Sequence, residues 1–159
     1  MKRLSPVLCL FLFLFLCSCS LTAKAPERIT EFSSDVKITC GGKEFAGTLE
    51  CLSYCSIKFT FSYPDRLNGV SVRTDENGFF CDIYGVTDIL PTALLNADSC
   101  AVRLFEALQN AVFSPLELRK NTAGDYTAQL LNGKYTSVYR SDGSVRLIYA
   151  NDGFTVEFI

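Results

Sequence analysis

Apolar and polar residues alternate along much of this chain with a period of two, which is the pattern of strands that bury one face. In residues 32–40 every second position is apolar or small, and residues 45–51 repeat the alternation. Gly41 and Gly42 lie between the two segments. Because a Gly-Gly pair supplies the backbone freedom of a tight turn, these segments are predicted to form a β-hairpin.

The same alternation recurs on both sides of the middle of the chain. Three more segments on the N-terminal side complete a predicted five-stranded meander, at residues 55–63, 70–74 and 79–84. On the C-terminal side, Asn-Gly and Asp-Gly pairs supply the positive φ of tight hairpin turns. Strands are predicted there at residues 126–131, 135–140, 145–149 and 154–158, with 116–120 as a further candidate.

Between these two sets of strands the period of the pattern changes. Residues 88–95 are predicted to form a short helix, in which Pro91 is tolerated in the first turn. Residues 100–113 repeat apolar side chains at three- and four-residue steps, which is typical of an amphipathic helix. Asp98 or Ser99 is the expected N-cap of this second helix.

The long meander needs a cover, because an open sheet of this length would otherwise expose a large apolar face. The two predicted helices are amphipathic and connect to strands at both ends. We therefore expect an α+β fold, in which a strongly curved antiparallel sheet wraps around a central helical hairpin. The sheet would be an open half-barrel of about nine or ten strands.

The first residues are typical of a secretory leader that ends in a lipid-attachment site. Lys2 and Arg3 precede the apolar run PVLCLFLFLFLC, which is shorter than the roughly 20 residues of a spanning helix. The following Leu-Cys-Ser-Cys ends at Cys19 and resembles the bacterial lipobox, in which a small residue precedes the diacylated cysteine. Cys17 is a rival acceptor that lacks the small residue, and an ordinary signal peptide with an incidental cysteine is the alternative.

These features divide the chain into three parts. Residues 1–18 are expected to be a lipoprotein signal peptide, residues 19–31 a lipid-anchored tether and residues 32–159 a single β-rich domain. A diacylglycerol on Cys19 supplies the two hydrophobic chains that stable anchoring needs. The expected location is therefore extracytoplasmic, on the outer face of the cell membrane.

Composition excludes several kinds of chemistry. The chain has no histidine, which removes histidine bases and histidine metal ligands. Two of the 15 basic residues lie in the leader, which leaves 13 against 17 acidic residues and argues against a nucleic-acid partner. We expect no cofactor, no metal and no enzymatic activity. The acidic residues considered for catalysis lie mostly in or beside predicted turns: Asp65, Asp75, Glu76, Asp82 and Asp88.

The predicted domain contains an odd number of cysteines. Cys51 and Cys55 are spaced C-x-x-x-C, which is not the usual metal or redox spacing. Core thiols are the favoured interpretation, because free cysteine is among the most buried residue types. One or two disulfides are the alternative. The cysteines are Cys40, Cys51, Cys55, Cys81 and Cys100.

The order of these elements resembles a known group of proteins. The segments FSSDVKITCGGKEFAGTLE and YPDRLNGVSVRTDENGFFCDIYGV, the latter with a P-x-x-L-x-G turn from Pro64 to Gly69, are similar to small lipoproteins of clostridia-type Firmicutes. Those share the LolA/LppX-like lipoprotein-carrier fold, a half-barrel with helices at its mouth. The resemblance implies either an acyl-chain carrier or a protein-binding module, including lipoproteins of sporulation and germination. It implies no catalytic residue.

Two functions follow from this resemblance and from the aromatic residues. The first is a binding module for a hydrophobic ligand, a lipid or acyl chain, with the candidate residues Phe45, Phe59, Phe61, Phe79 and Phe105. The second is a protein–protein interaction scaffold in the cell envelope or in sporulation and germination, with candidate contacts at Tyr63, Tyr84, Tyr135 and Tyr139.

Overall fold

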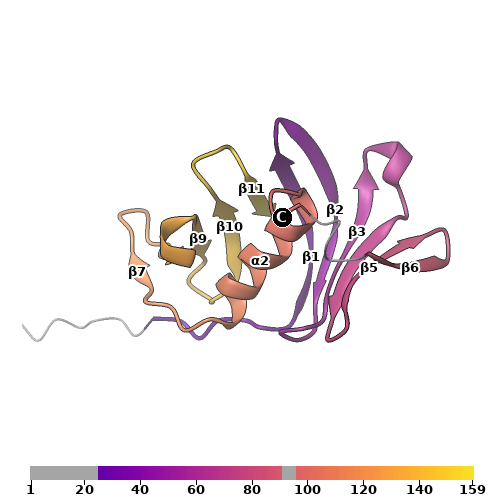
Figure 1. Cartoon of the computed structure of the whole chain (residues 1–159). Coiled ribbons are helices and arrows are strands. Elements are labelled where there is room, and N and C mark those ends of the chain that lie inside the picture. Colours follow the sequence, from indigo (N-terminus) through magenta and orange to yellow (C-terminus); the bar gives the residue numbers. More distant parts are fainter. Residues whose placement is uncertain (1–24, 91–95) are drawn as a thin grey trace, which may run out of the picture.

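A computed structural model describes residues 25–90 and 96–159. They form one open antiparallel sheet of eleven strands and one α-helix, α2 (Cys100–Phe113), which lies against one face of the sheet (Figure 1). The strand order is β6-β5-β4-β3-β2-β1-β11-β10-β9-β8-β7. The strands are β1 (Phe32–Cys40), β2 (Lys43–Cys51), β3 (Ile57–Tyr63), β4 (Ser71–Asp75), β5 (Gly78–Ile83), β6 (Val86–Leu90), β7 (Arg119–Lys120), β8 (Tyr126–Leu130), β9 (Tyr135–Tyr139), β10 (Val145–Tyr149) and β11 (Thr155–Phe158).

The two halves of the sheet join at its centre. β1 pairs with β2 from Phe32↔Cys51 to Cys40↔Lys43, through the predicted Gly-Gly turn. On its other side β1 pairs with the last strand, β11, where Val36 lies opposite Phe158. This long-range pairing makes β6 and β7 the two edges of the sheet.

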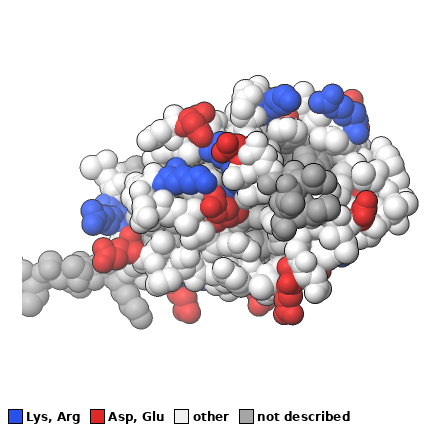
Figure 2. Space-filling view, viewed as in Figure 1, with Lys and Arg blue, Asp and Glu red and all other residues white. Residues whose placement is uncertain are grey.

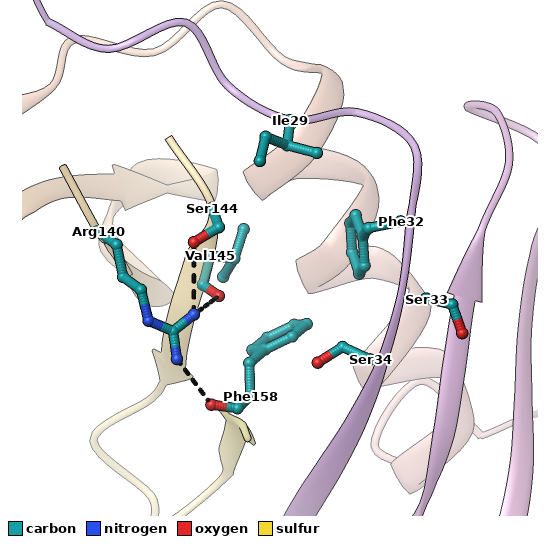
Figure 3. A pocket seen from close by; sticks show the side chains of 8 residues that line it. All are labelled: Ile29, Phe32, Ser33, Ser34, Arg140, Ser144, Val145 and Phe158. Atoms are coloured by element: carbon teal, nitrogen blue, oxygen red, sulfur yellow. Dashed lines mark hydrogen bonds between the residues drawn. The ribbon is translucent and has the colours of Figure 1, made fainter. Parts of the chain in front are cut away.

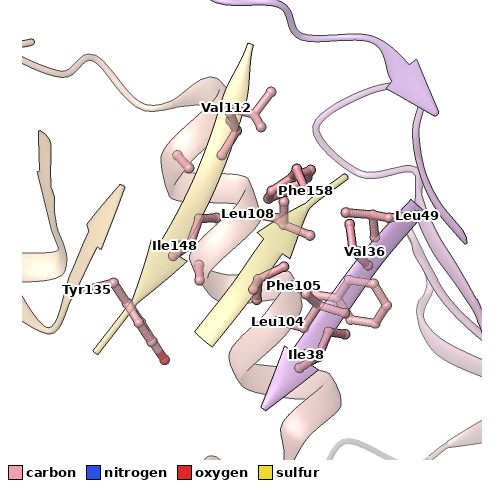
Figure 4. Close-up of a cluster of buried hydrophobic side chains, with 14 of the residues drawn as sticks. Val36, Ile38, Leu49, Leu104, Phe105, Leu108, Val112, Tyr135, Ile148 and Phe158 are labelled. Carbon is pink, nitrogen blue, oxygen red and sulfur yellow. The ribbon is translucent and has the colours of Figure 1, made fainter. Parts of the chain in front are cut away.

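The helix α2 packs its apolar side against the inner face of the sheet (Figure 4). The Ser99 side chain caps it by accepting a hydrogen bond from the Val102 amide at 3.4 Å, so Ser99 rather than Asp98 is the N-cap. From β9, the buried Tyr139 hydroxyl donates to the Ala111 carbonyl at 2.7 Å. The helical residues buried in the core are Arg103, Leu104, Phe105, Ala107, Leu108, Ala111 and Val112.

The predicted helical hairpin is wrong, and with it the predicted fold class. Residues 88–90 belong to the strand β6 instead of the start of a helix, while residues 91–95 lie outside the described residues. β-Branched Val86, Thr87 and Ile89 favour a strand, and the turn at Tyr84 and Gly85 directs them back along β5. The sheet therefore gains a strand and is an open eleven-stranded sheet beside a single described helix. The candidate strand at 116–120 is reduced to Arg119–Lys120.

The described part of the predicted tether lies against the domain. Arg28 Nη1 donates to the Ala111 carbonyl at 2.9 Å, and the Ile29 amide donates to the Gly143 carbonyl at 3.3 Å. The Cys51 thiol donates to the Thr30 carbonyl at 3.4 Å. Cys19 and the predicted signal peptide lie outside the described residues, and no helix among those described is long and apolar enough to cross a membrane.

Candidate functional site

The five phenylalanines predicted to bind a hydrophobic ligand form two groups in the space between the inner face of the sheet and α2. Phe45, Phe59 and Phe61 lie on β2 and β3, where the Phe61 ring centroid is 5.9 Å from that of Phe45 and 4.7 Å from that of Phe59. Phe79 of β5 packs against Phe105 of α2, with 5.5 Å between centroids. Because Phe59 and Phe105 are each only 1% exposed, they fill the core, and ligand binding by this set stays a prediction.

A groove of about 310 Å³ lies beside the second group, between α2 and the strands β4 and β5. Phe79, Val102 and Phe105 supply its apolar side, and Glu106 and Gln109 supply polar atoms. Ligand sites commonly have about 300–1,000 Å³. The groove is therefore at the lower limit of the size that would hold part of an acyl chain.

A smaller pocket of about 160 Å³ lies where β1, β11 and the turn between β9 and β10 meet (Figure 3). The guanidinium of Arg140, which lines this pocket, donates hydrogen bonds to three acceptor atoms of the chain. Arg140 Nη2 donates to the Phe158 carbonyl at 3.1 Å, and Nη1 donates to the Val145 carbonyl at 3.3 Å and to Ser144 Oγ at 3.4 Å. These contacts hold the end of β11 to the turn, so Arg140 has a structural role.

Charged residues also fix the position of α2. Arg103 Nη2 lies 2.9 Å from Asp152 Oδ1, and its guanidinium stacks 4.4 Å from the Phe154 ring centroid. Burial is the largest single effect on Arg103 and lowers its pKa, but hydrogen bonding and charge interactions with Asp152 and Tyr135 together outweigh burial and raise the pKa. The hydrogen bond from Arg103, followed by one from the Phe154 amide, lowers the pKa of Asp152. Glu106 accepts from Tyr135 Oη at 3.0 Å. These contacts join the helix to the C-terminal strands.

A second polar network lies on the outer face of β4, β5 and β6. Arg73 Nη1 lies 2.8 Å from Asp75 Oδ2, and the Arg73 guanidinium stacks 4.1 Å from the Phe80 ring centroid. Asp82 accepts hydrogen bonds from Thr87 of β6 and from Ser71 of β4. The hydrogen bond from Thr87 makes the largest contribution to lowering the pKa of Asp82, and the one from Ser71 lowers it further. The network ties the edge strand β6 to the two strands behind it.

The β5–β6 hairpin exposes the largest apolar side chains at one end of the sheet. Tyr84 is 77% exposed, Val86 70%, Ile89 60% and Ile83 49%. Basic and acidic side chains are scattered over the face shown in Figure 2, and the β5–β6 end of the molecule is largely uncharged in that view. Among residues 25–90 and 96–159 no strand pairs with the outer edge of β6, which therefore combines an open backbone edge with exposed apolar side chains.

The tyrosines predicted to contact a partner divide into two pairs. Tyr63 and Tyr84 are exposed, as that prediction requires. Tyr135 and Tyr139 are completely buried, so their predicted role as surface contacts is wrong. Both project toward α2, because they lie on the inner face of β9 and hydrogen-bond to residues of that helix.

The five cysteines of the domain are free thiols. Cys40 and Cys51 are buried in the core, and the other three are partly buried. Burial, with a smaller contribution from Glu31, raises the pKa of Cys51 to about 11. In residues 25–90 and 96–159 no three cysteine or carboxylate side chains gather in a group that would hold a metal ion.

No protein-family model matches this chain, and no curated protein is similar enough to it to count as a match.

Proposed function

We propose that this chain is an interaction module, anchored to a membrane through Cys19, that binds an extended segment of a partner protein along β6. The observation that carries the proposal is the contrast between the two edges of the sheet. β7 is two residues long, Arg119 and Lys120, and short charged edges protect a sheet against pairing. β6 is five residues long and apolar at both ends.

The backbone of β6 offers hydrogen bonds to such a segment. Tyr84 and Gly85 have φ of 49° and 87°, which form a two-residue hairpin turn, so Ile83 and Val86 make a hydrogen-bonded pair. In an antiparallel ladder the direction of the backbone groups alternates. The N–H and C=O groups of Thr87 and Ile89 therefore point away from β5, toward the open edge.

The side chains of β6 favour a partner strand of a particular composition. Val86 and Ile89 lie on opposite faces of the sheet, so an added strand would cover apolar surface on both. The only charged residue of β6 is Asp88, and it is exposed. The complementary segment is therefore extended, rich in β-branched residues and basic at one position. Pairing of a peptide with an open sheet edge is an established mode of recognition.

Binding is testable with the full chain in detergent micelles and a fluorescent peptide of sequence Val-Thr-Val-Lys-Val-Thr, measured by anisotropy. Ile89→Lys adds a like charge at the edge and should weaken binding at least tenfold. Ile159→Lys is the matched control, because Ile159 is also exposed but belongs to no strand, and it should bind like the parent. Equal affinities of the two variants, or no binding by the parent, would refute the proposal.

A hydrophobic ligand is the second candidate, and the groove beside Phe79 and Phe105 supports it. In this alternative an acyl chain would lie between α2 and β5. Lipid extraction of the purified chain followed by mass spectrometry distinguishes the two functions. A bound lipid that is lost on Val102→Glu, a change in the lining of the groove, would favour the carrier.

A further inference from the structure

One buried hydroxyl on the inner face of the sheet has no hydrogen-bond partner. Thr74 of β4 is 6% exposed, and among residues 25–90 and 96–159 no group bonds to its Oγ1. Its cross-strand neighbours are apolar, because Thr74 lies opposite Ile57 of β3 and Phe79 of β5. A buried hydroxyl without a partner destabilises a fold, and valine would fill the same space without that cost. The hydroxyl therefore needs an explanation other than stability.

The groove between α2 and β5 offers this explanation, because Thr74 belongs to its lining. On the opposite wall, Val102, Glu106 and Gln109 follow one another at steps of four and three residues, so they share one face of α2. Phe79 closes the groove on the side of the sheet. Apolar surface, a hydroxyl, a carboxylate and an amide thus border the same space of about 310 Å³.

The polar atoms left over on the helix wall are hydrogen-bond acceptors. Glu106 Oε2 accepts from Lys134 Nζ at 2.8 Å and from Tyr135 Oη at 3.0 Å. In the part of the chain that the structure describes, no donor bonds to Glu106 Oε1. Gln109 Nε2 donates to the Tyr54 carbonyl at 3.2 Å, which leaves the side-chain oxygen of Gln109 for another donor. A ligand that satisfies these atoms must supply N–H or O–H groups.

The charges of the lining favour a cation over an anion. Asp75 and Glu106 line the groove, and no lysine or arginine is among the described residues that do. Asp75 is already bonded to Arg73 and to the Asn77 amide, so Glu106 is the carboxylate with an acceptor to spare. A carboxylate or phosphate head group would meet like charge here, whereas an ammonium group would form charge-assisted hydrogen bonds. The volume is at the lower limit of ligand sites and fits a compact molecule.

We propose that this groove binds a small amphiphile with a primary ammonium group, an alkylamine or arylalkylamine. The apolar part lies against Phe79, Val102 and Phe105, and the ammonium group donates to Glu106 Oε1 and to the Thr74 hydroxyl. The proposal names the ligand class for the second candidate function, the hydrophobic-ligand site, and rests on that function. It does not depend on pairing at β6.

Three probes with the same aromatic group and different head groups test the ligand class: phenethylamine, phenethyl alcohol and hydrocinnamate. Each is titrated into the full isotope-labelled chain in detergent micelles. Binding is followed by the NMR shifts of the Gln109 side-chain amide and the Gly78 backbone amide, which both line the groove. Phenethylamine should bind at least about tenfold more tightly than hydrocinnamate, with the alcohol between them.

Thr74→Val tests the role of the hydroxyl, because it removes the oxygen and keeps the shape of the side chain. It should weaken phenethylamine binding roughly tenfold and leave the urea midpoint equal to or above that of the parent. A residue that served only the fold would show the reverse, a lower midpoint. Thr155→Val is the matched control, because Thr155 of β11 lines a separate hollow over β1 and β2, and it should bind phenethylamine like the parent.

The other outcomes separate this proposal from the function on which it rests. Equal affinity for phenethylamine and hydrocinnamate, or equal binding by Thr74→Val and the parent, would overturn the ammonium site and leave a site for hydrophobic ligands. Absence of binding by all three probes would overturn both. A lower urea midpoint of Thr74→Val would show that the fold itself uses the hydroxyl, which would also overturn the proposal.

Discussion

Replacement of Gly47 by alanine is a sharp test of how closely β2 and β3 pack. Gly47 lies on the inner face of β2, beside a register shift between Ala46 and Gly47. A methyl group there would lie 2.9 Å from two carbons of the Phe59 ring, and the Thr60 carbonyl oxygen would fall inside contact distance as well. Glycine within a strand often marks such a close approach.

The expected cost follows from these contacts. Favourable carbon–carbon separations begin at about 3.5 Å, so the Phe59 ring must move by about 0.6 Å, and the Thr60 carbonyl, which is closer to the added methyl group, must move further. Phe59 is only 1% exposed and packs edge-to-face against Phe61, which leaves the ring no free space, and the Thr60 backbone is paired with Thr48. We expect Gly47→Ala to destabilise the protein by about 3 kcal/mol, at the upper end of the costs of overpacking. For a domain of this size that is a thermal shift of roughly 10 °C.

Urea unfolding followed by far-ultraviolet circular dichroism measures this cost, provided that the denaturant slope is unchanged. Gly153→Ala is the matched control. Gly153 has φ of +86° but no atom within 4 Å of the added methyl, so it reports backbone strain alone, about 1–2 kcal/mol. If Gly47→Ala unfolds within about 0.5 kcal/mol of the parent, the close packing inferred for β2 and β3 is wrong.

Three further changes test the contacts of α2. Ser99→Ala removes the cap on the Val102 amide and should cost about 1 kcal/mol in urea unfolding. Tyr139→Phe removes the donor to the Ala111 carbonyl and should also cost about 1 kcal/mol, measured in the same way. Asp152→Asn should flatten the pH dependence of the urea midpoint below about pH 4. The pKa of Asp152 is lower in the folded than in the unfolded chain, so its stabilisation is present above the unfolded pKa and is lost as the pH falls through the folded one.

Each of these three has a control and a contrary outcome. Ser53→Ala, which lies outside the helix, should leave the unfolding curve unchanged. If Ser99→Ala also leaves the free energy of unfolding unchanged, Ser99 does not stabilise α2 as its cap. Tyr149→Phe, on the partly exposed side of β10, should cost less than about 0.5 kcal/mol. If the urea midpoint falls with decreasing pH in the same way in Asp152→Asn and in the parent, the contact between Asp152 and Arg103 does not stabilise the folded protein.

Local patterns predict most of the individual elements. The alternation in residues 32–40 and the Gly-Gly turn indicate β1 and β2 because both signals depend only on neighbouring residues. The period of residues 100–113 predicts α2 with its bounds for the same reason. The prediction fails at residues 88–90 because it joins this short run to residues 91–95 as one helix. The β-branched residues before the run, Val86 and Thr87, favour a strand, and residues 88–90 continue that strand.

The candidate site depends on long-range pairing, which no local pattern contains. The pairing of β11 with β1 covers the other end of the N-terminal run of strands, which leaves β6 and β7 as the two edges of the sheet. The surface prediction for Tyr135 and Tyr139 fails because alternation shows that a strand has two faces, but does not show which of them a helix covers. Since the pattern around Ile89 predicts a helix, its exposure on a strand edge could not be anticipated.

The docked N-terminal segment limits how far the domain would move on its anchor. Since Arg28 and Ile29 are hydrogen-bonded to the domain and the Glu27 backbone lies against Gly143, the part of the tether that docks on the domain begins by Glu27. From an acylated Cys19 to Glu27 the chain would span about 28 Å when fully extended, roughly two thirds of the reach of a tether that ended at Phe32. The described chain begins on the β7 side of the molecule, opposite β6 (Figure 1). In a domain held in this way the edge strand β6 would lie at the end of the molecule opposite the attachment point, so a partner that pairs with β6 would not have to pass between the anchor and the domain.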